Sequence, residues 1–248
     1  MKNNFFYKKP ISNIYKNSSK YSETISQIIY GEKFKILSKN KKWLKIKTSF
    51  DNYIGYIKNE GYEKNYKPTH KVFVLKANIL DKTKKKTKYF LTFASKISII
   101  QEEKKFIEFE KNKWIKKTDI KKINYIERDY LKIFKLFLNT KYLWGGRTYK
   151  GIDCSAILQL IFYYNNKFYP RDTKDQIRYS KKKIRRKIFK KGDIIFWKGH
   201  VAICINSKKL IHAYGPENKV LIMPIVDTIN RIEKTAKLMV KKISSIKY

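Results

Sequence analysis

Residues 142–155 read YLWGGRTYKGIDCS and are followed at once by an apolar run from Ala156 to Tyr164. The three glycines predict a tight loop, and the run predicts a buried helix over 153–165. Cys154 then lies in the first turn of that helix. The helix dipole and the free N–H groups of a first turn favour the thiolate form of a cysteine. The stretch therefore predicts a nucleophilic Cys154 on an α-helix.

Two of the three histidines follow where a base is needed, because a cysteine nucleophile requires a group that takes its proton. His200 comes after Gly199 at the start of one predicted strand, and His212 lies in the next strand. In neighbouring antiparallel strands both side chains can lie on the same face. We expect His200 and His212 to meet Cys154. The third histidine, His70, is expected to be a loop residue.

The pattern around this stretch predicts an α+β domain over residues 123–248. An amphipathic helix is expected over 125–139, with Ile126, Ile133 and Phe137 inward and Glu127 outward. A short helical stretch follows Pro170. The predicted strands, which form an antiparallel meander, cover 193–197, 200–205, 209–213 and 219–223.

The first half of the chain is built from short alternating runs, which predict strands. A weak repeat relates residues 43–47 to residues 106–110, and suggests two small β-barrels over 1–66 and 67–122. The predicted linker, 59–70, carries Gly61 and Pro68. For each module, any small barrel with a buried tryptophan remains an alternative.

The chain is strongly basic, with 59 Lys+Arg against 20 Asp+Glu and a net charge of +39 over 248 residues. Such a surface attracts anions. The lysines are scattered, however, and no nucleic-acid motif accompanies them, so we expect no specific nucleic-acid partner. A solvated surface is favoured for the basic run 181–187. Anionic lipid or polymer remains an open alternative as a partner.

The two cysteines are too few for a disulfide framework, and no CxxC pair suggests a metal site. We expect no cofactor and no metal, and Cys204 is expected to pack in an apolar strand. Lysines interrupt Phe5-Phe6-Tyr7 too early for a signal peptide, and no segment is apolar enough to span a membrane. The expected location is the cytoplasm. The sequence gives no indication of the oligomeric state.

Six ordered motifs resemble the NlpC/P60 family of papain-like cysteine peptidases, which hydrolyse peptide bonds in murein stems. They are YLWGG (142–146), GIDCS (151–155), PRDTKDQ (170–176), KGDIIFW (191–197), GHVAI (199–203) and LIHA (210–213). The resemblance implies Cys154 as nucleophile, His200 as base and then acid, and His212 as the residue that orients His200. It also implies that Tyr142 helps the Cys154 N–H to bind the oxyanion. Ala156 departs from the glycine that is usual in the family.

Residues 11–62 resemble the bacterial SH3-like module found beside cell-wall hydrolases. The arrangement is similar to that of cytoplasmic recycling enzymes, which cleave after γ-D-Glu in murein-derived peptides with a free N-terminal L-Ala. The resemblance implies that Asp153 binds the substrate ammonium, aided by Tyr53 and Glu23. A helix N-cap is the alternative for Asp153. Further hydrogen bonds to the substrate are expected from Ser155 and Thr173.

Two other interpretations remain open. The same residues would serve an exported murein endopeptidase that acts on the polymeric wall. A protein of another class would bind an anionic polymer through its basic surface without catalysis. The intact set of Cys154, His200 and His212 argues against this second alternative.

Overall fold

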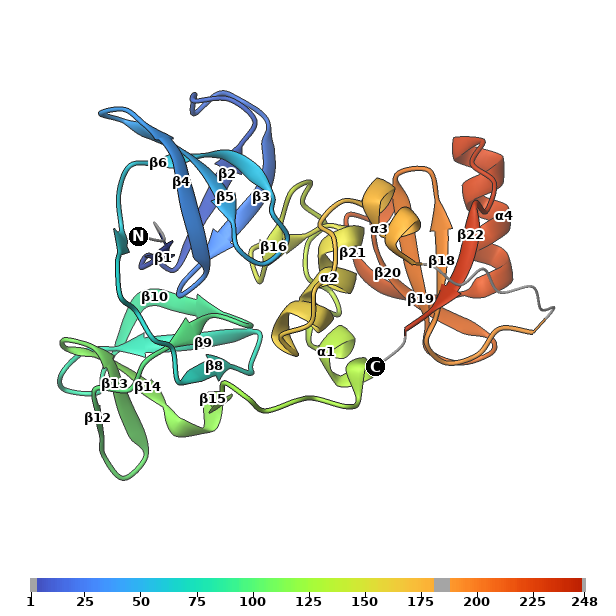
Figure 1. The fold of residues 1–248 in the computed structure, drawn as a ribbon. Helices are drawn as coiled ribbons and strands as arrows, with labels where there is room; N and C mark the ends of the chain where they lie inside the picture. Colours follow the sequence, from blue (N-terminus) through green and yellow to red (C-terminus); the bar gives the residue numbers. More distant parts are fainter. Residues whose placement is uncertain (1–3, 181–187, 247–248) are drawn as a thin grey trace. The chain divides into compact units, whose positions relative to one another are not determined.

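The computed structural model describes residues 4–180 and 188–246, and it divides into two compact units. The N-terminal unit comprises Met1–Glu127 together with Tyr163–Lys167. The C-terminal unit comprises Arg128–Phe162 and Phe168–Tyr248. Figure 1 shows both units as a ribbon, with labels on most helices and strands.

The first sheet of the N-terminal unit has seven strands in the order β3-β2-β6-β5-β4-β1-β7 (Figure 1). Alternation explains the burial: in β5, Leu44, Ile46 and Thr48 are buried, whereas the residues between them are partly exposed. The strands are β1 (Asn4–Tyr7), β2 (Ile11–Tyr15), β3 (Thr24–Ile29), β4 (Lys33–Lys39), β5 (Trp43–Thr48), β6 (Ile54–Lys58) and β7 (Tyr62–Glu63). Leu44 and Ile46 form one core with Ile14, Phe34 and Ile57. The region is SH3-like and consists of strands, as predicted.

The second half of this unit contains a five-stranded sheet, β10-β9-β14-β13-β12, and a three-stranded sheet, β11-β8-β15. The elements are β8 (His70–Val72), β9 (Lys76–Leu80), β10 (Lys86–Thr92), β11 (Lys96–Ile97), β12 (Gln101–Glu102), β13 (Phe106–Glu110), β14 (Lys113–Lys116), η1 (Lys117–Asp119) and β15 (Ile120–Lys122). The expectation that His70 lies in a loop was wrong. It opens β8 and pairs with Ile97 and Lys122, because the strand already begins within the predicted linker.

The backbone approaches itself closely at Gly31, between β3 and β4. Gly31 has a φ of +75°, and a Cβ placed there would lie 1.9 Å from the carbonyl oxygen of Lys96. The N–H of Lys96 donates to the carbonyl of Tyr30 over 2.9 Å. Only glycine satisfies both the left-handed backbone and the contact.

The C-terminal unit begins with α1 (Tyr130–Leu136), which is shorter than the predicted helix. Asp129 caps it by accepting the N–H of Leu131. Ile133 and Phe137 are buried as predicted, but Ile126 is 48% exposed and Glu127 is buried. These two assignments were wrong because residues 125–129 precede the helix and do not follow its period.

The C-terminal unit contains an antiparallel sheet whose strands lie in the order β21-β20-β19-β18-β22 (Figure 1). The elements are β16 (Arg147–Thr148), β17 (Gly151–Ile152), α2 (Cys154–Tyr164), α3 (Thr173–Tyr179), β18 (Asp193–Trp197), β19 (His200–Cys204), β20 (Lys209–Tyr214), η2 (Gly215–Glu217), β21 (Lys219–Pro224), α4 (Ile225–Ala236) and β22 (Lys242–Ser245). The predicted meander is confirmed, whereas α4 and β22 were not predicted. One core joins Ile225 and Ile232 of α4 to Trp197 and Leu210 of the sheet. Within the described parts of the chain, no helix is both long and apolar enough for a membrane crossing.

Candidate active site

Cys154 lies in the first turn of α2, as predicted, and is its first residue. The carboxylate of Asp153 accepts the N–H of Ala156 over 2.8 Å, which is the N-cap interaction. The predicted N-cap is therefore confirmed. The side chains of α2 that follow, among them Ile157 and Ile161, are fully buried. A helix that is buried on all sides is held by the core around it, which fixes the position of its first turn.

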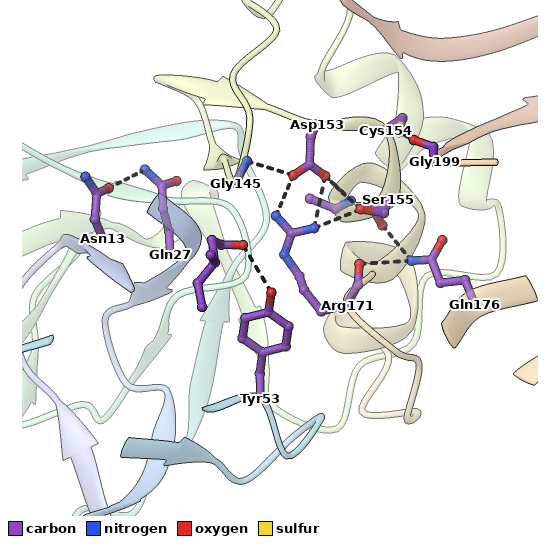
Figure 2. Close-up of polar contacts among 12 residues, drawn as sticks. Asn13, Gln27, Tyr53, Gly145, Asp153, Cys154, Ser155, Arg171, Gln176 and Gly199 are labelled. Atoms are coloured by element: carbon purple, nitrogen blue, oxygen red, sulfur yellow. Dashed lines mark hydrogen bonds and ion pairs between the residues drawn. The ribbon is translucent and has the colours of Figure 1, made fainter. Parts of the chain in front are cut away.

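Asp153 is the centre of a buried polar cluster, shown in Figure 2. Arg171 binds it with both terminal nitrogens, Nη2 to Oδ2 at 2.6 Å and Nη1 to Oδ1 at 3.0 Å. The N–H of Gly145 donates to Oδ2, and the hydroxyl of Ser155 donates to Oδ1, each over 3.0 Å. With the Ala156 N–H, five donors therefore surround one carboxylate. Asp153 and Arg171 are at most 5% exposed.

Arg171 is a site residue to which we assigned no role from the sequence. Arg171 follows Pro170 in a polar segment, which predicts an exposed side chain. The structure shows instead that Arg171 is buried. Gln176 was missed in the same way. Its side chain is fully buried and donates to the carbonyls of Ser155 and Pro170, so it ties α3 to the first turn of α2 (Figure 2).

The thiol of Cys154 is 4% exposed and points to the chain around His200. Its sulfur lies 3.9 Å from the carbonyl oxygen of Gly199, and the N–H of Val201 donates toward it. Burial raises the pKa of Cys154 to about 12, and the negative charge of Asp153 adds to this effect. The expectation that the helix start favours thiolate was therefore wrong for the resting site: the cost of burying a charged sulfur exceeds the gain from the helix N-terminus.

His200 and His212 are in direct contact, with Nε2 of His200 2.9 Å from Nδ1 of His212. Strands β19 and β20 pair Ile203 with Ile211 and Cys204 with Leu210. Continuing this register makes the two histidines diagonal neighbours on one face. The prediction that they share a face is confirmed.

Both imidazoles are neutral at pH 7. His200 as a whole residue is partly exposed, yet the surrounding protein removes enough water to lower the pKa of its imidazole to about 4. His212 is fully buried, and burial, with smaller contributions from His200 and Arg231, lowers its pKa well below 6.5. A neutral His200 can accept a proton from a neutral thiol.

Tyr142 and Thr173 flank the nucleophile. The pKa of the Tyr142 phenol is raised by burial and by the nearby Cys154 and Asp153, so the hydroxyl stays a donor. The side chain of Thr173, the first residue of α3, forms a hydrogen bond with the thiol. The hydroxyl of Ser155 accepts a hydrogen bond from Nη1 of Arg171 over 2.9 Å. Binding of substrate by Thr173 and Ser155 stays a prediction.

Tyr53 and Glu23 belong to the N-terminal unit. The hydroxyl of Tyr53 donates to the carbonyl of Ile25 over 3.4 Å (Figure 2). Glu23 is exposed and forms an ion pair with Lys16 over 3.5 Å. Their part in substrate binding stays a prediction.

The remaining sequence predictions concern packing, metal and charge. Cys204 is fully buried in the core beside Trp197 and Leu210, as predicted. Among the residues that the structure describes, no three His, Cys, Asp or Glu side chains gather in a way that could hold a metal ion. The basic run 181–187 lies outside the described residues.

Comparison with known families identifies two modules. Residues 139–236 match the NlpC/P60 family, and residues 14–61 match the bacterial dipeptidyl-peptidase Sh3 domain. The chain is 25% identical over 236 residues to the gamma-D-glutamyl-L-lysine dipeptidyl-peptidase of Bacillus subtilis, covering 85% of this chain and 79% of that protein. It is 33% identical over 116 residues to a protein of the same name from Bacillus cereus, covering 44% of this chain and 34% of the relative.

The same fold occurs in a solved structure, an NlpC/P60 family protein from Bacillus cereus. The two superpose with a TM-score of 0.76 at 18% identity, over 90% of this chain and 94% of the other. The NlpC/P60 match contains Tyr142, Cys154, His200 and His212, the residues for which the sequence predicts catalytic roles. The chain is a cysteine peptidase with an NlpC/P60 domain that follows a bacterial SH3 domain.

Proposed function

We propose that the protein hydrolyses the bond between γ-D-Glu and the diamino acid in murein-derived peptides that have a free N-terminal L-Ala. The observation that carries the reaction type is the arrangement in the C-terminal unit: a cysteine at the first turn of α2, beside the strand that presents His200 with His212 against it. The neutral thiol and neutral imidazole define the starting state.

In the proposed reaction, Sγ of Cys154 attacks the γ-carbonyl carbon of D-Glu while His200 takes the thiol proton. The oxyanion accepts hydrogen bonds from the N–H of Cys154 and from the phenol of Tyr142. The N–H of Cys154 is available because a residue in the first turn has no hydrogen-bond partner within the helix. His200 then gives the proton to the leaving amine of the diamino acid, which leaves a thioester. A water molecule, deprotonated by His200, hydrolyses the thioester and releases L-Ala-γ-D-Glu.

Support for the substrate comes from the relatives and from charge. The Bacillus subtilis relative is named for cleavage at γ-D-glutamyl-L-lysine, and it is similar over most of both chains. A buried substrate ammonium must be paired, and Asp153, Tyr53 and Glu23 are the proposed partners. Because five donors already surround the Asp153 carboxylate, the ammonium would have to share that charge with Arg171. The net charge of +39 favours a substrate rich in carboxylates.

We place this activity in the recycling of cell-wall peptides in the cytoplasm. A free L-Ala amine exists only on a stem peptide that has been detached from its glycan, so selection for that amine implies a soluble fragment as substrate. An exported enzyme that cleaves the intact wall would have no use for an ammonium site. Selection for a free N-terminal amine therefore distinguishes a recycling enzyme from an exported murein endopeptidase.

The test compares three substrates: free L-Ala-γ-D-Glu-L-Lys, the same peptide with an acetylated amine, and purified sacculi. We expect hydrolysis of the free peptide and at least a hundredfold lower kcat/KM for the acetylated one, since the ammonium pairing is lost. Equal cleavage of free and acetylated peptides, or efficient digestion of sacculi, would contradict the proposed selection. Binding of these substrates without cleavage of any would favour the non-catalytic alternative.

A further inference from the structure

His212 has both ring nitrogens engaged, and its second partner is unusual. Nδ1 faces His200 at 2.9 Å, and Nε2 lies 3.3 Å from the sulfur of Met223, in the neighbouring strand β21. His212 pairs with Leu221 across these strands, so Met223 is its diagonal neighbour. The ring of Tyr214 stacks on His212 with 4.7 Å between centroids and 12° between planes. The imidazole is therefore held between a ring face, a histidine and a thioether.

The thioether decides where the protons of both histidines lie. Its sulfur has no hydrogen and can only accept, so the contact with Nε2 is a hydrogen bond only when Nε2 carries the proton. A neutral imidazole has one N–H, which leaves Nδ1 of His212 as an acceptor. Nε2 of His200 must then donate to it. His200 consequently has a free lone pair on Nδ1, the nitrogen that can take the Cys154 proton.

The opposite arrangement is unproductive. With the proton of His212 on Nδ1, a lone pair on Nε2 would face the lone pairs of sulfur. Nε2 of His200 would then be the acceptor, and its own proton would occupy Nδ1. In that state His200 could not take a proton from Cys154.

We propose that Met223 is a positioning residue, whose sulfur accepts the Nε2–H of His212 and so holds His212 and His200 in the tautomers that let His200 act as base. The inference rests on the proposed roles of Cys154, His200 and His212. The proposed role also explains why a methionine, and not an acidic residue, stands at position 223. A carboxylate at this place would favour a protonated His212, whose Nδ1–H would block donation from His200, whereas a thioether fixes the tautomer without adding charge.

The surroundings keep His212 neutral, as this scheme requires. Burial lowers the pKa of His212 well below 6.5, and the charged Arg231 of α4 acts in the same direction. Arg231 lies over the ring of Tyr214 at 5.5 Å and is paired with Glu217 at 2.7 Å. Among the described residues, the titratable groups whose contacts place them against the imidazole are His200 and Tyr214, and Arg231 lies over the Tyr214 ring.

The test is the ring ¹⁵N NMR spectrum of the full chain, measured at pH 7. The chain has three histidines, so the spectrum contains three imidazole rings. The variant His70→Gln assigns the third ring. We expect His212 and His200 to carry their protons on Nε2, with both Nδ1 atoms unprotonated. Protons on Nδ1 of either ring in the wild type would overturn the proposal. This measurement does not depend on activity, so it stays decisive even if the proposed substrate is not cleaved.

Two substitutions separate the hydrogen bond from packing. Met223→Leu keeps the volume but removes the acceptor, so we expect mixed tautomers and about tenfold lower kcat with little change in KM. Met223→Gln supplies an amide oxygen and should restore the wild-type tautomers and most of kcat. Met239→Leu, at a methionine that is 69% exposed, is the control and should change neither. Unchanged tautomers and kcat in Met223→Leu would contradict the proposal.

Discussion

Arg171 holds Asp153, the residue before the nucleophile, through a two-pronged buried salt bridge with N–O distances of 2.6 and 3.0 Å. A planar guanidinium fits this geometry, and a lysine ammonium does not. Because Asp153 also caps α2, the same carboxylate fixes the helix start and the position of Cys154. The ion pair therefore ties the segment before α3 to the catalytic cysteine, in addition to the contacts that Thr173 and Gln176 of α3 make with the first turn of α2.

Removing Arg171 should leave a buried carboxylate without its counter-charge. We expect Arg171→Ala to lower the free energy of unfolding by about 3–5 kcal/mol. Arg178→Ala, on α3 directly after this segment, is the matched control: Arg178 is exposed, and its 3.8 Å pair with Asp175 should contribute less than about 1 kcal/mol. Urea denaturation of both variants measures the difference. Similar small losses in the two would contradict the structural importance of the buried pair.

The phenol of Tyr142 should act mainly on the transition state. Tyr142→Phe keeps the ring and removes the donor, so we expect kcat to fall by about 10²-fold while KM changes little. Steady-state kinetics on the free tripeptide measures this. Tyr149→Phe, in the same loop and five residues before the nucleophile, is the comparison. Burial raises the pKa of Tyr149 without a contribution from Cys154, so this variant should keep wild-type kcat. A rise in KM with unchanged kcat in Tyr142→Phe would assign this residue to substrate binding instead.

The acidic limb of the pH profile should lie at low pH. His200 acts as a base only when neutral, and its pKa is lowered from 6.5 to about 4. Protonation, and with it loss of kcat/KM, should therefore set in as the pH falls toward 4, and not near 6.5. A pH series with short incubations, in which the enzyme is returned to pH 7 to verify recovery, measures the limb. A midpoint at or above 6.5 would mean that the imidazole is far better hydrated than the structure indicates.

Alanine substitutions at Gly31 and Gly199 separate the stability cost of a left-handed backbone from the cost of a steric clash. Both have a left-handed φ, +75° and +76°, but only at Gly31 would a Cβ collide with another atom, the Lys96 carbonyl oxygen. Alanine at Gly199 should cost about 1–2 kcal/mol of stability from the backbone alone. Alanine at Gly31 adds overpacking and should cost about 1–3 kcal/mol more. Equal losses in thermal or urea unfolding would contradict the close approach.

The parts of the site that could be predicted from the sequence are those encoded locally. The apolar run after Cys154 specifies α2, and the alternation around His200 and His212 specifies a hairpin with both rings on one face. Ordered motifs linked these segments to one catalytic domain. None of this required knowledge of long-range packing.

The parts that were missed or wrong depend on contacts between distant residues. Glu127 is buried because its backbone exchanges hydrogen bonds with the side chain of Asn165, far along the chain, and no helical period predicts that. Arg171 becomes a site residue only when α3 packs beside α2. The thiolate expectation for Cys154 considered the helix start but not the burial of sulfur, which decides its pKa.

The central claim is that Cys154 cleaves the bond after γ-D-Glu. Incubation of L-Ala-γ-D-Glu-L-Lys with the protein, followed by mass spectrometry, tests it most directly. Wild type and Cys204→Ala, which alters the other buried cysteine, should release L-Ala-γ-D-Glu and free lysine, whereas Cys154→Ala should release neither. Release of these products by folded Cys154→Ala, or no release by wild type, would contradict the account.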